Sequence, residues 1–174
     1  MDLSFGPEYE GFRDEVVTFL ASNADKAPKG NDLRGQQAKD WQKLLIEHGY
    51  TCRTIPKEFG GYGAEPDIIK TRIIAEEFSK ARVNTGLGGQ GISMLVPTLL
   101  EMGTQEQREH FIRPTIMGDM IWCQGYSEPG AGSDLAALST AAVLDGDEWV
   151  INGQKIWTST AHIADWIFCL VRSE

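Results

Sequence analysis

Residues 122–134 read Trp122-Cys123-Gln124-Gly125-Tyr126-Ser127-Glu128-Pro129-Gly130-Ala131-Gly132-Ser133-Asp134. The segment begins like a short strand and passes into a loop of small and hydroxyl-bearing residues. As a loop alone it could be a polar turn that leaves a strand. However, Gly130 and Gly132 permit backbone conformations closed to other residues. Ser133 and Asp134 also stand where clustered N–H groups could meet a pyrophosphate, so the stretch predicts an anion-binding loop.

Strand-like patterns continue beyond this loop. Ser139 to Leu144 alternates loosely, Asp145-Gly146-Asp147 turns the chain, and Glu148 to Ile151 returns. Asn152-Gly153 is the strongest short hairpin signal, because both residues tolerate positive φ. It predicts a second hairpin with Gln154 to Ser159 as the partner strand.

The last predicted strand, Asp165 to Arg172, is almost continuously apolar, which predicts burial on both faces. Trp149, Trp157 and Trp166 all fall in this sheet. Antiparallel sheets need their edges paired or covered. We therefore expect the sheet to be incomplete in this chain and the natural protein to continue past Glu174.

Residues before Gly118 show helical periods instead. Apolar residues from Tyr9 to Leu20 predict a helix over 8–21. Four more helices are predicted: around 38–48 with a stop at Gly49, from Pro66 to Phe78, over 92–102 despite Pro97, and from a capping box at Thr104–Gln107 to near Pro114. The expected fold class is α+β, an all-α helical bundle (residues 1–118) followed by an incomplete antiparallel β-barrel domain (residues 119–174).

Composition excludes several classes of function. The 174 residues carry a formal net charge of -9, which argues against a nucleic-acid surface but not against a locally held anion. The sequence has no secretory signal and no apolar run near the ~20 residues that span a bilayer. Three cysteines without metal spacing, Cys52, Cys123 and Cys169, are expected to be reduced, mostly buried thiols. These features favour a cytoplasmic protein without a metal site.

A glycine-rich stretch, Gly86-Leu87-Gly88-Gly89-Gln90-Gly91, matches the G-x-G-x-x-G dinucleotide motif. That motif requires a preceding strand and a βαβ unit. Here Arg72 to Arg82 is charged and helical, so we favour a connection between helices with close backbone packing.

Several motifs together resemble the acyl-CoA dehydrogenase family. Ser127 to Asp134 matches its hydroxyl-Glu-Pro-small-x-Gly-Ser-Asp pattern, and Asn152 to Ser159 matches Asn-Gly-x-Lys-x-Trp-x-(Ser/Thr). In the helical part, Pro56 to Gly61 and Gly103 to Gln107 stand in the family's order. The resemblance covers nearly the whole chain.

The resemblance implies a site for FAD. Tyr126 and Ser127 would lie at the isoalloxazine ring, Ser133 near the pyrophosphate and the acyl-CoA, and Trp157 beside the ring. The alternative for Trp157 is a core aromatic that fills the sheet, and both roles can hold together. The full set of expected cofactor contacts is Gln124, Tyr126, Ser127, Gly132, Ser133, Trp157, Thr158 and Ser159. Ser133 is also the expected substrate contact.

The activity implied by the resemblance is oxidation of an acyl-CoA to the trans-2-enoyl-CoA, with electrons passing to FAD and then to an electron-transfer flavoprotein. Family members form homomeric or heteromeric tetramers. The family's general base is a glutamate expected beyond Glu174, so no catalytic residue is assigned and the chain alone is expected to be inactive. Glu128 is expected to be a structural carboxylate, and His48, His110 and His162 form no triad.

Other functions share this fold and stay open. They are an acyl-CoA oxidase, a nitroalkane oxidase, a flavin-dependent monooxygenase, or a non-catalytic fragment that binds flavin or a partner. The bulky segment from Trp122 to Tyr126 resembles bacterial members that act on dicarboxylic, branched or steroid side-chain CoA esters.

Overall fold

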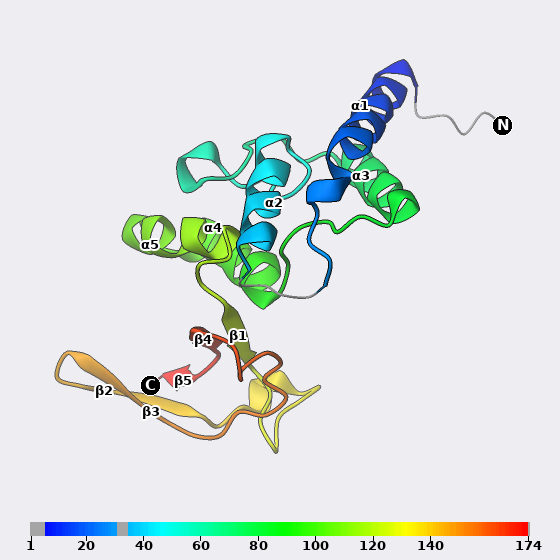
Figure 1. The fold of residues 1–174 in the computed structure, drawn as a ribbon. Coiled ribbons are helices and arrows are strands. Elements are labelled where there is room, and N and C mark those ends of the chain that lie inside the picture. The colour runs from blue at the N-terminus through cyan, green and yellow to red at the C-terminus, as the bar shows by residue number, and fades with distance from the viewer. Residues whose placement is uncertain (1–5, 31–34, 174) are drawn as a thin grey trace.

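The computed structural model describes residues 6–30 and 35–173, so residues 1–5, 31–34 and 174 lie outside it. Helices form the N-terminal part and strands the C-terminal part, joined at β1 (Figure 1). The helices are α1 (Pro7–Asn23), α2 (Gln36–Glu47), α3 (Ile68–Ala81), α4 (Val96–Met102) and α5 (Gln105–Ile116). The strands are β1 (Trp122–Gly125), β2 (Ala141–Asp145), β3 (Glu148–Asn152), β4 (Trp166–Cys169) and β5 (Arg172–Ser173).

Local capping decides where the helices begin and end. The predicted capping box is present, with the Thr104 hydroxyl accepting from Gln107 N and the Gln107 side chain accepting from Thr104 N. Gly49 follows α2 with φ of 70°, which confirms the predicted stop. Helix α3 begins two residues after Pro66, because the Asp67 carboxylate caps it by accepting from two backbone N–H groups.

The helix predicted over 92–102 is only partly confirmed. Residues Gly91–Leu95 form a π-helical turn that leads into α4, in which Pro97 occupies the first turn. Proline lacks an N–H group, so it fits an early position where no hydrogen bond is lost. The helix is buried on one side only, since Met102 is 78% exposed.

Two apolar cores stabilise the helical part. The first joins α1, α2 and α3 through residues such as Val16, Trp41 and Phe78. The second packs α4 and α5 against the loop after α2, and it includes Trp122 of β1. The Trp122 indole N–H donates to Thr115 Oγ1 at 2.8 Å. The first strand is therefore anchored in the helical core.

The strands form two small sheets, and the prediction of an antiparallel barrel is not confirmed. Strand β1 pairs with β4 in parallel, and β2 pairs with β3 antiparallel and with β5 in parallel. The predicted first hairpin is confirmed, with a two-residue turn at Gly146-Asp147 and φ of 62° at Gly146. Parallel partners need long crossovers that no local pattern shows. The sheets do not close on themselves (Figure 1).

The hairpin predicted at Asn152-Gly153 is wrong. Asn152 pairs with Ala141 as the last residue of β3, and residues 153–158 continue without strand pairing. Gly153 is not among the glycines with positive φ; instead, a Cβ there would lie 2.6 Å from the Thr140 Cα. The glycine is needed for space beside Thr140, whereas the hairpin prediction assumed a need for positive φ.

Strand β4 was predicted to be buried on both faces, and this is also wrong. Trp166 is 45% exposed and Ile167 is 48% exposed. One face of Trp166 is covered, because its ring stacks on Trp122 at 5.6 Å between centroids. Cys169 is exposed, unlike the buried Cys123, so the prediction of buried thiols fails there. Among the described residues, no helix is long and apolar enough to cross a membrane.

Candidate functional site

The end of β1 lies between two later segments of the chain. The Ile156 N–H donates to the Ser127 carbonyl at 2.9 Å, and the Leu170 N–H, just after β4, donates to the Gly125 carbonyl at 3.1 Å. These bonds bring the segment after β1 beside the segment that leads into Trp157. The two predicted clusters, Tyr126–Ser127 and Trp157–Ser159, are therefore neighbours in space although about thirty residues separate them.

The first cluster, Tyr126–Ser127, lies with Gln124 at the end of β1. Gln124, Tyr126 and Ser127 are half-buried. The Gln124 carboxamide accepts from Gln90 Nε2 at 3.3 Å, and the Tyr126 ring meets the Phe168 ring edge-on at 5.7 Å between centroids. The Tyr126 ring is thus held against β4.

The second cluster is more open. Trp157 lies outside the strands and is 85% exposed, so the alternative of a core aromatic is wrong for the described chain. Its φ of 56° is unusual for a bulky residue, and such backbone strain gathers at functional sites. Thr158 is half-buried and Ser159 is exposed, so one flat indole face and two hydroxyl groups stand at this edge.

The glycine loop is closed at its base and open at its tip. Glu128 and Ala131 exchange two backbone hydrogen bonds of 2.8 and 3.1 Å. Gly132 and Ser133, beyond this bridge, are exposed, and a Cβ built on Gly130 or Gly132 would meet no atom within 4 Å. Backbone N–H groups in this loop can therefore be approached closely by a ligand.

A buried ion pair underlies this region. Glu128 and Lys155 have side chains only 5% and 10% exposed, and Lys155 Nζ donates to Glu128 Oε1 at 2.7 Å. The Ser139 N–H, the Ser139 hydroxyl and the Thr140 N–H also donate to this carboxylate. The Lys155 ammonium, followed by these hydrogen bonds, holds the pKa of Glu128 well below its usual range. The prediction that Glu128 is a structural carboxylate is confirmed. Lys155 lies within the Asn152–Ser159 motif but is not among the expected cofactor contacts.

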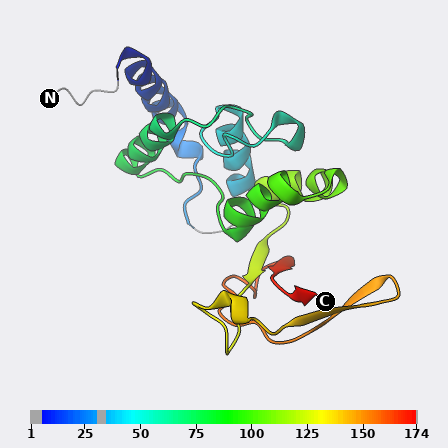
Figure 2. The same cartoon turned by 180° about the vertical axis from the view of Figure 1, so that it is seen from behind.

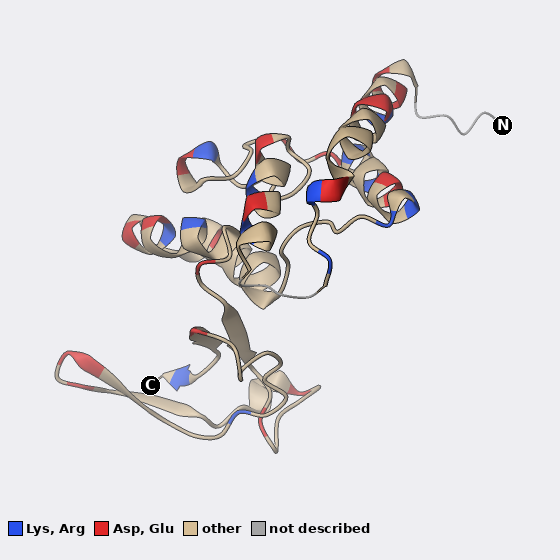
Figure 3. Cartoon of the chain, viewed as in Figure 1, with Lys and Arg blue, Asp and Glu red and all other residues tan. Residues whose placement is uncertain are grey.

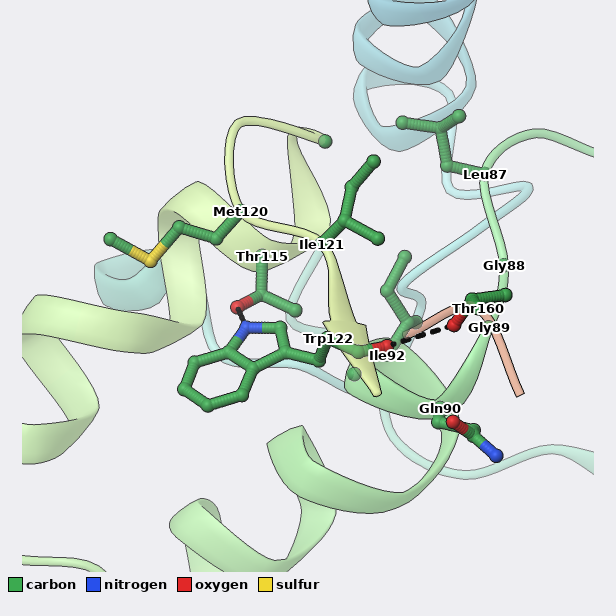
Figure 4. A pocket seen from close by; sticks show the side chains of 12 residues that line it. Leu87, Gly88, Gly89, Gln90, Ile92, Thr115, Met120, Ile121, Trp122 and Thr160 are labelled. Atoms are coloured by element: carbon green, nitrogen blue, oxygen red, sulfur yellow. Dashed lines mark hydrogen bonds between the residues drawn. The ribbon is translucent and has the colours of Figure 1, made fainter. Parts of the chain in front are cut away.

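An apolar pocket opens between the glycine-rich connection, the end of α5 and β1 (Figure 4). The connection packs closely, as predicted, since a Cβ on Gly91 would lie 2.8 Å from the Trp122 ring. By contrast, a Cβ on Gly88 or Gly89 would meet nothing within 4 Å. No sequence pattern indicates the pocket, because its walls come from three separate segments. It is lined by Leu87, Gly88, Gly89, Gln90, Gly91, Ile92, Thr115, Gly118, Met120, Ile121, Trp122 and Thr160.

The pocket adjoins the predicted site. Thr160, on the pocket wall, directly follows Ser159, and Gln90, also on the wall, donates to Gln124. Within residues 6–30 and 35–173, no group of three or more His, Cys, Asp or Glu side chains is placed to hold a metal ion. The local chemistry is thus an open, polar strand edge beside an apolar hollow.

Comparison with known proteins agrees with this arrangement. The family model for the acyl-CoA dehydrogenase N-terminal domain matches residues 6–119, and the model for the acyl-CoA dehydrogenase middle domain matches residues 123–174. The acyl-CoA dehydrogenase IpdE1 of Mycobacterium tuberculosis is 40% identical over 176 residues, which are 96% of this chain and 45% of IpdE1.

Two solved structures are similar across the whole chain. The crystal structure of the ChsE4-ChsE5 complex from Mycobacterium tuberculosis has a TM-score of 0.73 and 33% identity, covering 100% of this chain and 45% of that one. The Tcur3481-Tcur3483 steroid ACAD has a TM-score of 0.71 and 32% identity, with the same coverage. The chain spans about half the length of these relatives. With both domain models matched in order, this chain belongs to the acyl-CoA dehydrogenase family.

Proposed function

We propose that this chain is the N-terminal and flavin-binding portion of an FAD-dependent acyl-CoA dehydrogenase. The parent protein would oxidise an acyl-CoA thioester to the trans-2-enoyl-CoA and pass the electrons through FAD to an electron-transfer flavoprotein. The observation that carries the proposal is the hydrogen bond from Ile156 to Ser127, because it joins both motif segments at one edge beside an apolar pocket. The division at residue 118 belongs to the same proposal.

The residues present fit an FAD. The open loop around Gly132 and Ser133 leaves room for a pyrophosphate against backbone N–H groups, where Ser133 would also meet the acyl-CoA. The exposed indole of Trp157 offers a flat surface beside a ring system. Gln124, Tyr126, Ser127, Thr158 and Ser159 would supply polar contacts around that ring. When bound, FAD supplies the hydride acceptor, and hydrogen bonds from this edge would tune it.

The apolar pocket is proposed to receive the acyl group. Its wall is mainly apolar and bears no side chain at Gly88 and Gly89. The printed title of one similar structure describes a steroid ACAD. This title and the resemblance of the bulky segment from Trp122 to Tyr126 favour a CoA ester with a branched or cyclic acyl group.

The parent protein is proposed to act as a homo- or hetero-oligomer, and the two-component titles of similar structures favour a second type of chain. We assign no general base within the described residues. The buried carboxylate at the base of the loop, Glu128, is occupied by Lys155, Ser139 and Thr140, so it is unsuited to proton removal.

Flavin retention tests this proposal. The purified chain, incubated with FAD and desalted, should keep flavin absorbance bands. Ser133→Trp should lower the retained flavin by filling the space proposed for the pyrophosphate, whereas Thr98→Trp, on the exposed side of α4, should not. Equal flavin retention by both variants would contradict the assignment of Ser133, and no retention by the unchanged chain would contradict flavin binding by this portion alone.

A further inference from the structure

We propose that Lys155 is a positioning residue that holds the backbone of Tyr126 and Ser127 in the orientation needed at the flavin edge. The inference rests on the proposed function, because it concerns the same edge. It assigns a task to a side chain that is set back from the expected flavin contacts and is itself nearly buried.

The Lys155 ammonium group is hydrogen-bonded to the segment that follows β1. Lys155 Nζ donates to two acceptors of one segment, the Tyr126 carbonyl at 3.1 Å and Glu128 Oε1 at 2.7 Å. Glu128 is in turn fixed by the Ser139 and Thr140 N–H groups. A side chain with three donors can thus hold the start of the glycine loop at two points.

The bond from Lys155 fixes the direction of the peptide group between Tyr126 and Ser127. In a trans peptide the carbonyl and the following N–H point to opposite sides, and the described residues contain no cis peptide bond. Turning the Tyr126 carbonyl toward Lys155 therefore turns the Ser127 N–H away from Lys155. The next peptide follows the same rule, with the Ser127 carbonyl on Ile156 N and the Glu128 N–H on Ala131 O. Lys155 thereby sets the direction of a backbone donor at the proposed ring edge.

Lys155 lies in the segment that leads into Trp157. Lys155 immediately precedes Ile156, whose N–H binds Ser127, and stands two residues before Trp157. One side chain consequently ties together the two segments that carry the expected flavin contacts. A salt bridge at the surface would not do this, because exposed ion pairs hold their partners weakly.

The experiment compares Lys155→Met with Lys39→Met, which removes the more exposed ion pair between Lys39 and Asp119. Both changes remove one ammonium and keep a long side chain. We expect Lys155→Met to weaken FAD binding by about tenfold to a hundredfold, the cost of one or two charge-assisted hydrogen bonds, and to shift the visible flavin band. Lys39→Met should leave both within about twofold. Lys155→Arg, which keeps the charge and the donors, should recover most of the affinity.

Amide hydrogen exchange provides a readout that does not need the flavin. In Lys155→Met, the Ile156 N–H should exchange faster while the amides of α2 and α3 keep their protection. If this variant unfolds, Glu128→Gln combined with Lys155→Met removes both charges and serves in its place.

The outcomes separate this inference from the proposed function. Unchanged FAD affinity and band position in Lys155→Met would overturn the positioning role, and so would unchanged exchange at Ile156. If the unchanged chain retains no FAD, flavin binding by this portion fails, while exchange at Ile156 still decides whether Lys155 positions the edge.

Discussion

In the strand part, the residue type at several positions is required by the folded surroundings. Gly153 stands against Thr140, Glu128 collects donors from Ser139, Thr140 and Lys155, and Trp157 adopts a positive φ. None of these requirements is visible from neighbours along the chain. At such a position, the residue type depends on the space and the charges around it, which only the folded structure shows.

Gly153 is expected to tolerate no added methyl group. In Gly153→Ala the new Cβ would lie 2.6 Å from the Thr140 Cα, so the backbone must move, at a cost of about 1–3 kcal/mol in unfolding free energy. Gly132→Ala is the matched control, because its Cβ meets no atom within 4 Å and should change stability by about 0.5 kcal/mol or less. Urea unfolding followed by tryptophan fluorescence measures both. Equal stability of the two variants would show that Thr140 does not limit the space beside Gly153.

Glu128 is expected to make the strand part sensitive to acid. Lys155 and the donors of Ser139 and Thr140 lower the pKa of Glu128 from its ordinary value of 4.5, so the folded state binds this proton less readily than the unfolded state. The stability that the carboxylate contributes is therefore complete above pH 4.5 and is lost progressively as the pH falls below it.

The measurement is the free energy of unfolding between about pH 6 and pH 3. Glu128→Gln should lower stability at pH 6 and flatten the acid slope, since an uncharged amide does not titrate. Glu148→Gln, on the exposed strand β3, controls for the loss of one carboxylate. An identical acid slope in the Glu128 variant and the unchanged chain would show that the ion pair does not contribute.

At the scale of elements, sequence patterns predicted the helices more accurately than the strands. The apolar period of α1 and the capping box of α5 depend on residues three or four apart, so both could be predicted. The parallel partners of β1 and β2 could not be predicted, because β4 and β5 reach them across long crossovers. Apolar composition predicted that residues 166–169 form a strand but not that its faces are exposed.

The candidate site could also be predicted only in part. Its residues could be named from the motifs of two loops, yet their mutual placement depends on the bond between Ile156 and Ser127 and on Lys155. The pocket could not be predicted at all. Its walls combine Gly88 and Gly89 with Trp122 and Thr160, which are distant in the sequence.

Strand β1 is expected to couple the two parts of the chain. Trp122 is buried in the second helical core, donates to Thr115, and stacks on Trp166 of β4. Trp122→Ala should therefore cost about 3–5 kcal/mol, and it should lower the stability of helices and strands together. Trp149→Ala, at a site 54% exposed, should cost about 1 kcal/mol or less.

Circular dichroism at 222 nm, which follows the helices, and hydrogen exchange in β2 and β3 distinguish the two variants. A strand part that melts alone in Trp122→Ala, with α4 and α5 unaffected, would contradict this coupling. It would instead favour a clean division near residue 118.

At the scale of the whole molecule, charge and apolar surface are separated. Acidic and basic residues lie mainly on the helices, while the strands of the β2–β3 hairpin carry charge near their turn (Figure 3). This hairpin projects from the rest of the chain in both views (Figure 2). The net charge of -9 favours dispersal of the chain, whereas the hairpin surface favours association.

One face of the hairpin is expected to drive that association. Directly paired residues of antiparallel strands share a face, so Leu144 and Trp149 lie with Ile151 on one side. The opposite side presents Val143 and Val150 beside acidic Asp145 and Glu148. Leu144, Trp149 and Ile151 are all more than half exposed, so we expect the isolated chain to bind the dye ANS and to self-associate at micromolar concentration. Added salt should strengthen association by screening the net charge.

Light scattering and ANS fluorescence compare two double variants with the same gain in charge. Trp149→Lys with Ile151→Lys should reduce dye binding and association strongly, because it interrupts the continuous apolar face. Val143→Lys with Val150→Lys should have a smaller effect, since carboxylates already flank those two residues and keep that face hydrated. Equal effects of the two pairs would assign the association to charge alone. An unchanged chain that stays monomeric and dye-free at high salt would show that this face is too small to associate, despite its exposure.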